Sequence, residues 1–344
     1  MSQAAEAAAS SEALDCGNAI LDNQGRPAPG RRELDAAAER VHGQAHQTPV
    51  LTSRTLDACL GASVFFKCEN LQRVGAFKFR GAFNVVASLS AEERRQGFIT
   101  HSSGNHAQAL SLAAQLFDAP ATIVMPENAP AVKKAAVKGY GARIVECAPT
   151  QQSREETAAQ LLEEQGGHFV SPYDDARIIA GASTVARELL DEVPELDMIL
   201  VPVGGGGIAS GTALITGELS PETRVFGCEP SGADDAALSY ESGRRQTLAA
   251  PDTICDGLRA STSELTFSIL HQGLAGIVRV SDETTIRAMR FLWERMKMVV
   301  EASGAIGCGA LFGALEATGE DLAGRRIGVI LTGGNVDLQH LPWQ

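Results

Sequence analysis

Short apolar runs separated by helical stretches limit most strongly how this chain can fold. After an extended SVFFKC at 63–68, the runs GFIT, ATIVMP, ARIVEC, MILVPV, RVFGCEP and RIGVIL begin at residues 97, 121, 142, 198, 224 and 326. Continuous apolar runs are typical of strands that are buried on both faces. Strands that alternate with helices form a parallel-type open sheet with helices on both faces, so the predicted fold class is α/β.

The composition limits the partners of the chain. Its 344 residues are 44% hydrophobic and 21% charged, as in a soluble globular protein. A formal net charge of −13 argues against nucleic acid and against an anionic membrane as partners, because both require a basic face. No basic residue and no long apolar run precedes Arg26, which predicts a weakly ordered extension over residues 1–30 rather than a signal peptide or a membrane span.

The cysteines point to a reducing compartment. There are seven, they are dispersed along the chain, and no two form a CxxC pair. This pattern argues against a disulfide framework and against a zinc site. It predicts reduced thiols in a cytoplasmic enzyme.

Four polar or glycine-rich loops follow the expected strands. They are SSGNH at 102–106, VGGGG at 203–207, EPSGADD at 229–235 and TGGN at 332–335. In open parallel sheets, ligands bind beyond the carboxyl ends of the strands. We therefore expect these loops to converge on one crevice.

A lysine stands among small and apolar residues in GAFKFRG, residues 75–81. One interpretation is the start of an amphipathic helix, from which Lys78 extends its amine to water. The other is a reactive amine, since a lysine that forms a Schiff base must be partly desolvated so that its pKa falls. The segment alone leaves both interpretations open.

Two of the loops suggest anion binding. Four glycines at 204–207, between an expected strand and an expected helix, allow backbone N–H groups to surround a phosphate, although they also suit tight packing alone. The chain has no GxxxxGK[ST], and no GxGxxG opens its first strand–helix unit, so a phosphate outside a dinucleotide is favoured. In SSGNH, the side chains of Ser102, Ser103, Asn105 and His106 lie near a helix start, where they either hold a carboxylate or simply cap the helix.

The other two loops carry oxygen ligands. Glu229, Asp234 and Asp235 suit a hard divalent cation together with a backbone carbonyl, but an acidic turn in solvent is the simpler interpretation of these residues alone. Thr332 follows the last strand, where its hydroxyl either meets a ring nitrogen or caps the turn.

The order GAFK, SSGNH, GGGG and TGGN resembles the fold-type-II pyridoxal-phosphate enzymes, in particular their serine/threonine dehydratase and serine racemase branch. The resemblance extends from about Arg31 to Leu338 and implies two parallel-type open sheets. It also implies that Lys78 is the Schiff-base lysine, that Phe77 flanks the cofactor ring and that Asn105 meets its phenolic oxygen. Gly204, Gly205, Gly206 and Gly207 would hold the phosphate, and Thr332 would face the pyridine nitrogen.

Ser103, EPSGADD and WERMK at 293–297 are most similar to the racemase and hydroxyaspartate-dehydratase members. By this resemblance Ser103 is a second acid/base opposite Lys78. The substrate is bound by Ser102, Ser103, Gly104, Asn105 and His106, and Mg²⁺ or another divalent cation is bound by Glu229, Asp235 and the Ala233 carbonyl. Thr332, GAST at 181–184 and EASG at 301–304 depart from the common family pattern, so they leave the substrate open.

The resemblance implies a division of the chain and an activity. Residues 31–92 with 176–344 would form a large cofactor-binding domain and 93–175 a small one, in a homodimer. The expected reaction is loss of water from a small-molecule 3-hydroxy amino acid. Arg154 in TQQSREET matches an arginine that approaches a distal carboxylate, although the residue alone suits a helix surface. It favours 3-hydroxyaspartate, giving oxaloacetate and ammonia. The alternatives are a serine/threonine dehydratase, a serine racemase and a β-replacement synthase.

Overall fold

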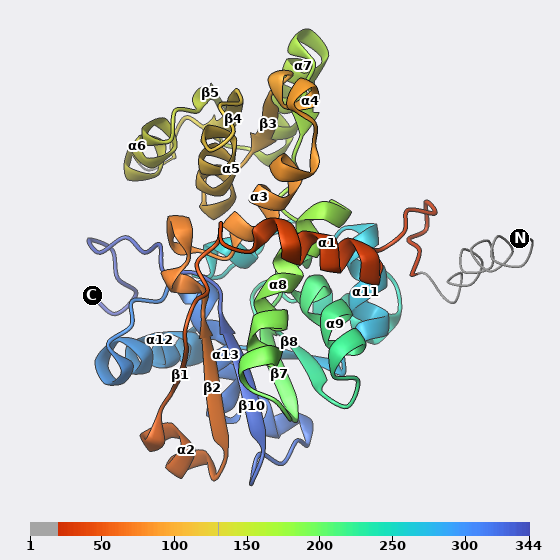
Figure 1. The fold of residues 1–344 in the computed structure, drawn as a ribbon. Helices are drawn as coiled ribbons and strands as arrows, with labels where there is room; N and C mark the ends of the chain where they lie inside the picture. The colour runs from red at the N-terminus through yellow and green to blue at the C-terminus, as the bar shows by residue number, and fades with distance from the viewer. Residues whose placement is uncertain (1–19, 130) are drawn as a thin grey trace, which may run out of the picture.

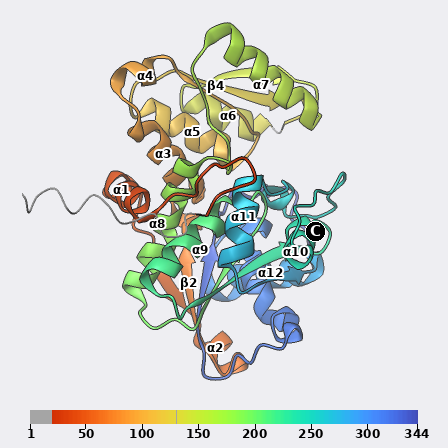
Figure 2. The ribbon, with the colours of Figure 1, turned by 90° about the vertical axis from the view of Figure 1, so that its right-hand side faces the viewer.

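A computed structural model describes residues 20–129 and 131–344 of the protein. Its strands form two separate sheets (Figure 1). The six-stranded sheet has the order β1-β2-β10-β7-β8-β9, with β1 Val50–Thr52, β2 Ser63–Cys68, β10 Arg326–Leu331, β7 Met198–Pro202, β8 Arg224–Pro230 and β9 Gly276–Val280. The four-stranded sheet has the order β5-β4-β3-β6, with β5 Arg143–Cys147, β4 Ala121–Pro126, β3 Phe98–His101 and β6 His168–Phe169. Figure 2 shows both parts after a quarter turn.

The α/β prediction is confirmed, with one difference in strand direction. All neighbouring strands are parallel except β1, which pairs antiparallel to β2. Only residues 53–62, which include α2 (Arg54–Leu60), connect these two strands. A parallel crossover needs about a dozen residues or more, so this short connection returns the chain in the opposite direction.

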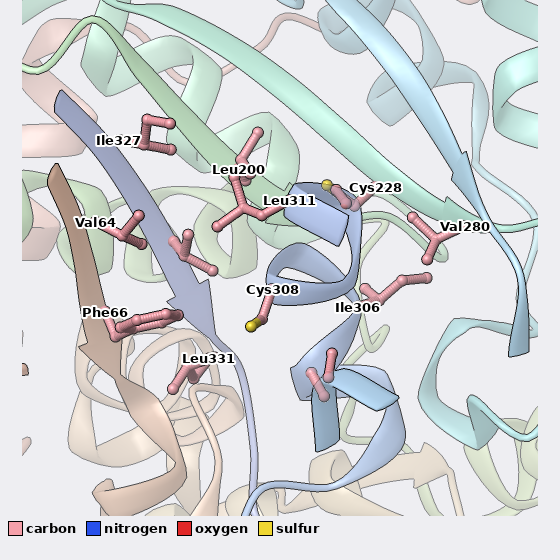
Figure 3. Close-up of a cluster of buried hydrophobic side chains, with 14 of the residues drawn as sticks. Val64, Phe66, Leu200, Cys228, Val280, Ile306, Cys308, Leu311, Ile327 and Leu331 are labelled. Carbon is pink, nitrogen blue, oxygen red and sulfur yellow. The ribbon is translucent and has the colours of Figure 1, made fainter. Parts of the chain in front are cut away.

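Helices cover both faces of the large sheet. On one face, α12 (Asp282–Met296) and α13 (Ala302–Gly309) close a core in which Phe66 and Leu200 of the strands meet Ile306 of α13 (Figure 3). On the other face, α8 (Ala176–Glu192) and α9 (Gly207–Leu219) bury the alternate strand residues, such as Ile199 and Ile330. Burial on both faces explains why these strands are continuously apolar in sequence.

The small sheet is also covered on both faces. Its hydrophobic cores contain residues of α3 (Lys78–Ser88), α5 (Asn105–Gln115) and α6 (Ala131–Gly139) on one side and of α7 (Gln151–Gln165) on the other. Because α3 packs against both α5 and α8, it connects the two parts of the molecule. The remaining α-helices are α1 (Arg31–Val41), α4 (Ala91–Arg95), α10 (Asp235–Ser242) and α11 (Glu264–Gly273).

The strands of the small sheet all come from residues 98–169, but the exact domain boundaries stay a prediction. Of the expected N-terminal extension, residues 1–19 lie outside the described part. Residues 20–30 form a turn that is tied to the body by an ion pair between Arg26 and Asp174 (3.1 Å). Within the described residues, no helix is long and apolar enough to cross a membrane, and the six cysteines found there are free thiols.

Candidate active site

A cavity of about 490 Å³ lies between the two sheets, at the carboxyl ends of β3, β7 and β10. Three of the four predicted loops line it: residues 102–106, the glycines at 204–207 and Thr332. The fourth, EPSGADD, does not contribute to its lining, because β8 carries it to a separate place beside α10. The expected convergence is therefore found for three loops and is wrong for the fourth.

Lys78 is the first residue of α3 and lines the cavity. Its Nζ donates to the Pro172 carbonyl (2.8 Å) and lies 4.9 Å from the centre of the Phe77 ring. Removal from bulk water lowers the pKa of the Lys78 amine to about 8. Of the two interpretations of this lysine, the geometry agrees with the desolvated, reactive amine.

The turn that carries Lys78 is attached to the end of the last strand. The Phe77 N–H donates to the Thr332 carbonyl (3.0 Å), and Ala76 forms an isolated β-bridge with Gly333. Thr332 itself is only 4% exposed. Two segments far apart in sequence thus hold the amine and the threonine hydroxyl on one cavity wall.

The glycine loop joins β7 to α9 and has no room for side chains. A Cβ at Gly205 would lie 2.3 Å from the ring of Tyr173, and a Cβ at Gly204 would lie 2.8 Å from the backbone of Leu258. Gly206 has a φ of +89°, which other residues rarely adopt. Bare backbone N–H groups at the start of a thirteen-residue helix make a cup for a phosphate.

The SSGNH loop places its polar groups at the start of α5. Asn105 is the first residue of that helix, and the Ser102 hydroxyl accepts a hydrogen bond from the Gly104 N–H (3.3 Å). His106 is buried with its Nε2 3.2 Å from the Val170 carbonyl. Burial and the nearby Lys78 lower the pKa of His106 to about 3, so its imidazole is neutral.

Tyr173 and Glu301 are among the cavity residues that were not assigned from the sequence. Tyr173 packs on the glycine loop, and Glu301 accepts hydrogen bonds from the Asn105 side chain (2.8 Å) and the Asn335 N–H (3.1 Å). Burial and the neighbouring Asp256 raise the pKa of Glu301 to about 8. The segment EASG at 301–304 departs from the common family pattern, but nothing in its sequence indicates a contact between Glu301 and Asn105.

Arg154 lies in the first turn of α7, half-buried, and lines the same cavity as Lys78. Within the part of the chain that the structure describes, no carboxylate forms an ion pair with it. Its Nε lies 3.4 Å from the Thr150 carbonyl. The guanidinium is therefore available to an anionic ligand in the cavity.

The predicted metal ligands lie together but apart from the cavity. The Glu229 carboxylate accepts the N–H groups of Ala236 (3.0 Å) and Ala237 (2.8 Å), and burial raises its pKa to about 8. Asp235 is 2% exposed, and its Oδ2 has no hydrogen-bond partner. Asp234 instead pairs with Arg279 (2.8 Å). Among the residues described, no group of three or more His, Cys, Asp or Glu side chains is arranged to hold a metal ion.

The cavity residues fit pyridoxal phosphate. A desolvated lysine beside an aromatic ring suits a flat aldehyde cofactor, and the glycine cup suits its phosphate. When bound, this cofactor withdraws electrons from the α-carbon of an amino acid.

Comparison with known proteins agrees with this geometry. A family model described as "Pyridoxal-phosphate dependent enzyme" matches residues 41–333. The chain is 48% identical to the L-threo-3-hydroxyaspartate ammonia-lyase of Saccharomyces cerevisiae, over 88% of this chain and 92% of the relative. It is 45% identical to the beta-hydroxyaspartate dehydratase of Paracoccus denitrificans, over 92% and 99% of the two chains.

A solved structure extends the likeness to the fold. Maize serine racemase superposes with a TM-score of 0.88 at 41% identity, covering 91% of this chain and 95% of that one. The chain therefore belongs to the pyridoxal-phosphate dependent enzymes of fold type II, in the branch that includes the 3-hydroxyaspartate ammonia-lyases and the serine racemases.

Proposed function

We propose that this enzyme is an ammonia-lyase that removes water from 3-hydroxyaspartate and yields oxaloacetate and ammonia. Two relatives at 45–48% identity are named for hydroxyaspartate. The observation that carries the proposal is that Arg154, without a carboxylate partner among the described residues, lines the cavity that contains Lys78. A guanidinium grips a carboxylate through two parallel hydrogen bonds, and hydroxyaspartate has a distal carboxylate that serine and threonine lack.

The cofactor is assigned to the residues of the cavity wall. Lys78 holds it covalently through Nζ, and the N–H groups of Gly204–Gly207 bind its phosphate. The Phe77 ring flanks the cofactor ring, the Asn105 side chain meets its phenolic oxygen and Thr332 faces its pyridine nitrogen. These five assignments are supported by the shared cavity and by the family membership.

The proton steps are assigned to the neighbouring side chains. Once the substrate's amine has taken the place of Lys78 on the cofactor, the freed Nζ would remove the α-proton of the substrate, for which an amine of pKa about 8 is suited near neutral pH. Ser102, Gly104, Asn105 and His106 orient the substrate at the start of α5. Hydroxide leaves the β-carbon and, with the proton that Lys78 removed, forms water. The resulting enamine takes up water again as it hydrolyses to the keto acid and ammonia.

Ser103 supports a second activity, racemisation. It lines the same cavity as Lys78, and by resemblance it stands on the opposite face of the substrate. Maize serine racemase shares the fold at 41% identity. A hydroxyl that donates a proton to the α-carbon from that face inverts the configuration. Ser103→Ala should then abolish racemisation of serine but leave elimination measurable.

We also propose a divalent cation, Mg²⁺, at Glu229, Asp235 and the Ala233 carbonyl, for which the unpartnered Asp235 oxygen is the support.

A cytoplasmic homodimer completes the proposal. Its support is the exposed pair Leu71 and Val299, which are neighbours because Asn70 donates to the Val299 carbonyl (3.1 Å). Light scattering on the purified protein would test the dimer.

Substrate preference tests the main proposal. The kcat/KM for each hydroxyaspartate stereoisomer, serine and threonine would be measured with wild type, Arg154→Ala and, as a matched control, Arg143→Ala. Arg143 is exposed on β5 and does not line the cavity. Loss of a charged hydrogen bond of about 1.5–3 kcal/mol predicts roughly a 10- to 150-fold loss for hydroxyaspartate with Arg154→Ala, and little change for serine. Equal losses on both substrates, or faster serine and threonine turnover by wild type, would support a general serine/threonine dehydratase instead.

A further inference from the structure

Three polar residues form a closed ring of hydrogen bonds beside the cavity, which Asn105 and Glu301 of the ring line. Asn105 Nδ2 donates to Glu301 Oε1 (2.8 Å), and Asn335 Nδ2 donates to Asn105 Oδ1 (2.9 Å). The backbone N–H of Asn335 donates to Glu301 Oε2 (3.1 Å) and closes the ring. Asn335 Nδ2 also donates to the Val74 carbonyl (2.6 Å).

The direction of every bond in this ring follows from one group. The Val74 carbonyl only accepts, so the side chain of Asn335 must present its NH₂ to it. The same NH₂ faces Asn105, which must therefore present its oxygen. The NH₂ of Asn105 then points at Glu301, whose carboxylate accepts it. Both ends of the Asn105 amide are thus fixed.

One N–H of Asn105 is left over by this arrangement. Its Nδ2 carries two hydrogens, of which Glu301 accepts one, while Oδ1 is occupied by Asn335. The remaining N–H is the only group that the amide still offers as a donor. If the amide turned over, its NH₂ would face the NH₂ of Asn335, and two donors would meet without an acceptor between them.

Two glycines provide the room for the ring. A Cβ at Gly333 would lie 2.4 Å from Glu301 Oε1 and 3.2 Å from Asn105 Nδ2. A Cβ at Gly75, which has a φ of +70°, would lie 2.6 Å from Asn335 Oδ1. Gly333 and Gly75 therefore leave the space in which the side chains of Asn105, Glu301 and Asn335 come together.

We propose that Glu301 and Asn335 are positioning residues, which hold the Asn105 amide so that its free N–H faces the cofactor. The inference rests on the proposed contact between Asn105 and the cofactor's phenolic oxygen, and it adds the groups that orient the donor. Asn105 starts α5 of the small part, whereas Glu301 precedes α13 and Asn335 follows β10 of the large part. The ring therefore also fixes the amide with respect to both sheets.

An isosteric change tests the direction of the bonds. Glu301→Gln keeps the size of the side chain but places an NH₂ against the Asn105 NH₂ or the Asn335 N–H, both of which are donors. The Asn105 amide must then turn or lose its partner. Glu163→Gln is the matched control, because it makes the same isosteric change at an exposed residue of α7 that takes no part in the ring.

The experiment is a double-mutant cycle with two readouts besides activity. Apo-protein would be titrated with pyridoxal phosphate to obtain Kd, and the visible absorption spectrum of the holoenzyme would be recorded, for Glu301→Gln, Asn335→Asp, Asn105→Ala and the double variant Asn105→Ala/Glu301→Gln. The melting temperature of each apo-protein shows whether it folds. We expect Glu301→Gln and Asn335→Asp each to raise the Kd for pyridoxal phosphate roughly tenfold or more, which is the scale of a lost hydrogen bond to a charged group. Each should also shift the absorption maximum of the holoenzyme.

The decisive result is the effect of Glu301→Gln when Asn105 is already alanine. If Glu301 acts through Asn105, the substitution no longer changes Kd or the spectrum in that background. Equal effects in both backgrounds would overturn the inference, and so would a wild-type spectrum for Glu301→Gln while Asn105→Ala is altered. If Asn105→Ala itself binds the cofactor like wild type, the proposed contact of Asn105 is wrong instead. Should Glu301→Gln fail to fold, Asn335→Asp in the same cycle gives the answer.

Discussion

The reactivity expected of Lys78 depends on its surroundings more than on any single partner. Its amine meets one backbone carbonyl and one aromatic ring, and desolvation alone lowers its pKa to about 8. A neutral amine is the nucleophile and the base, and it predominates above that pKa. The same residue thus has the chemistry for both proposed roles, cofactor binding and proton removal.

Replacement of Lys78 tests both roles. We expect Lys78→Ala to abolish turnover and to fold normally, because the cofactor's covalent attachment is lost while the glycine cup remains. Borohydride reduction of the wild-type holoenzyme should fix cofactor mass on the peptide that contains Lys78. Mass found on another lysine would refute the assignment.

The pH dependence of cofactor capture follows from the same pKa. Because only the neutral amine reacts, the rate at which apo-protein takes up pyridoxal phosphate should rise with pH and level off above about 8. Stopped-flow absorbance between pH 6 and pH 10 measures this rate. A rate that keeps rising toward pH 10 would indicate an amine with an ordinary lysine pKa.

The glycine loop gives a second test at a single residue. Gly205→Ala would bring a methyl group against the Tyr173 ring, so we expect cofactor Kd to rise roughly tenfold or more, since overpacking costs about 1–3 kcal/mol. Gly217→Ala in α9, the helix that follows the loop, is the control, because no atom lies within 4 Å of its added Cβ. It should leave Kd unchanged and stabilise α9 slightly. Equal Kd values for both variants would mean that the loop does not hold the phosphate.

The sequence could predict those site residues that stand within a recognisable local motif. Lys78 and the four glycines are recognisable because their neighbours in sequence are also part of their function. Tyr173 and Glu301 reach the cavity from segments without such a pattern. The role proposed for Glu301 depends on Asn105, which lies 196 residues away along the chain, and such a contact has no local signature in the sequence.

At the scale of elements, α3 is held by a buried group of charges. Arg80 is fully buried and pairs with Glu69 (2.8 Å) of the loop after β2 and with Glu188 (2.6 Å) of α8. Lys67 of β2 donates to the same Glu188 (2.6 Å) and to the Thr48 carbonyl (2.7 Å). Two positive and two negative charges balance, so the cluster fixes the first turn of α3 without a net charge.

Removal of one member should be costly. Arg80→Met leaves Glu69 buried without its partner, so we expect a loss of about 3–5 kcal/mol in the free energy of unfolding. The exposed pair Arg290 and Glu294 on α12 supplies the control, and Arg290→Ala should cost less than about 1 kcal/mol. Urea unfolding of both variants measures the difference. A loss for Arg80→Met as small as that of the control would show that the cluster relaxes or admits water.

The strands buried on both faces and the edge strand β5 could be predicted from the sequence, whereas the edge strands β1, β9 and β6 could not. The expected runs correspond to β2, β3, β4, β5, β7, β8 and β10. β1 and β9 are the edges of the large sheet, and each is partly exposed, so its apolar pattern is interrupted by polar residues such as Arg279. β6 has only two residues. Exposure and shortness both remove the signal on which the prediction depends.

At the scale of the whole molecule, the two sheets enclose the reaction cavity while the acidic group at Glu229 and Asp235 lies outside it. The proposed cation would therefore act through the stability of the fold rather than on the substrate. An overall charge of −13 gives no attraction specific to this place, so any binding must come from the local carboxylates.

Metal removal tests that group. We expect chelation to lower the melting temperature of the holoenzyme by a few degrees and added Mg²⁺ to restore it, because a ligand that binds only the folded state stabilises it. Glu229→Gln combined with Asp235→Asn should abolish the response. Asp234→Asn should keep it, since Asp234 pairs with Arg279. A metal-stripped wild type that ignores Mg²⁺ would refute the cation site.

The place of β10 has a consequence for how the protein is made. The last strand of the chain is inserted between β2 and β7, and Ser63 pairs with Arg326. On the ribosome, the small sheet can therefore be complete while β2 and β7 still lack their common neighbour. Until residues 326–331 leave the exit tunnel, these two apolar strands keep open edges that can pair with other chains. The large sheet can close only after these residues have emerged, so the strands next to the active site are the ones whose edges stay open longest.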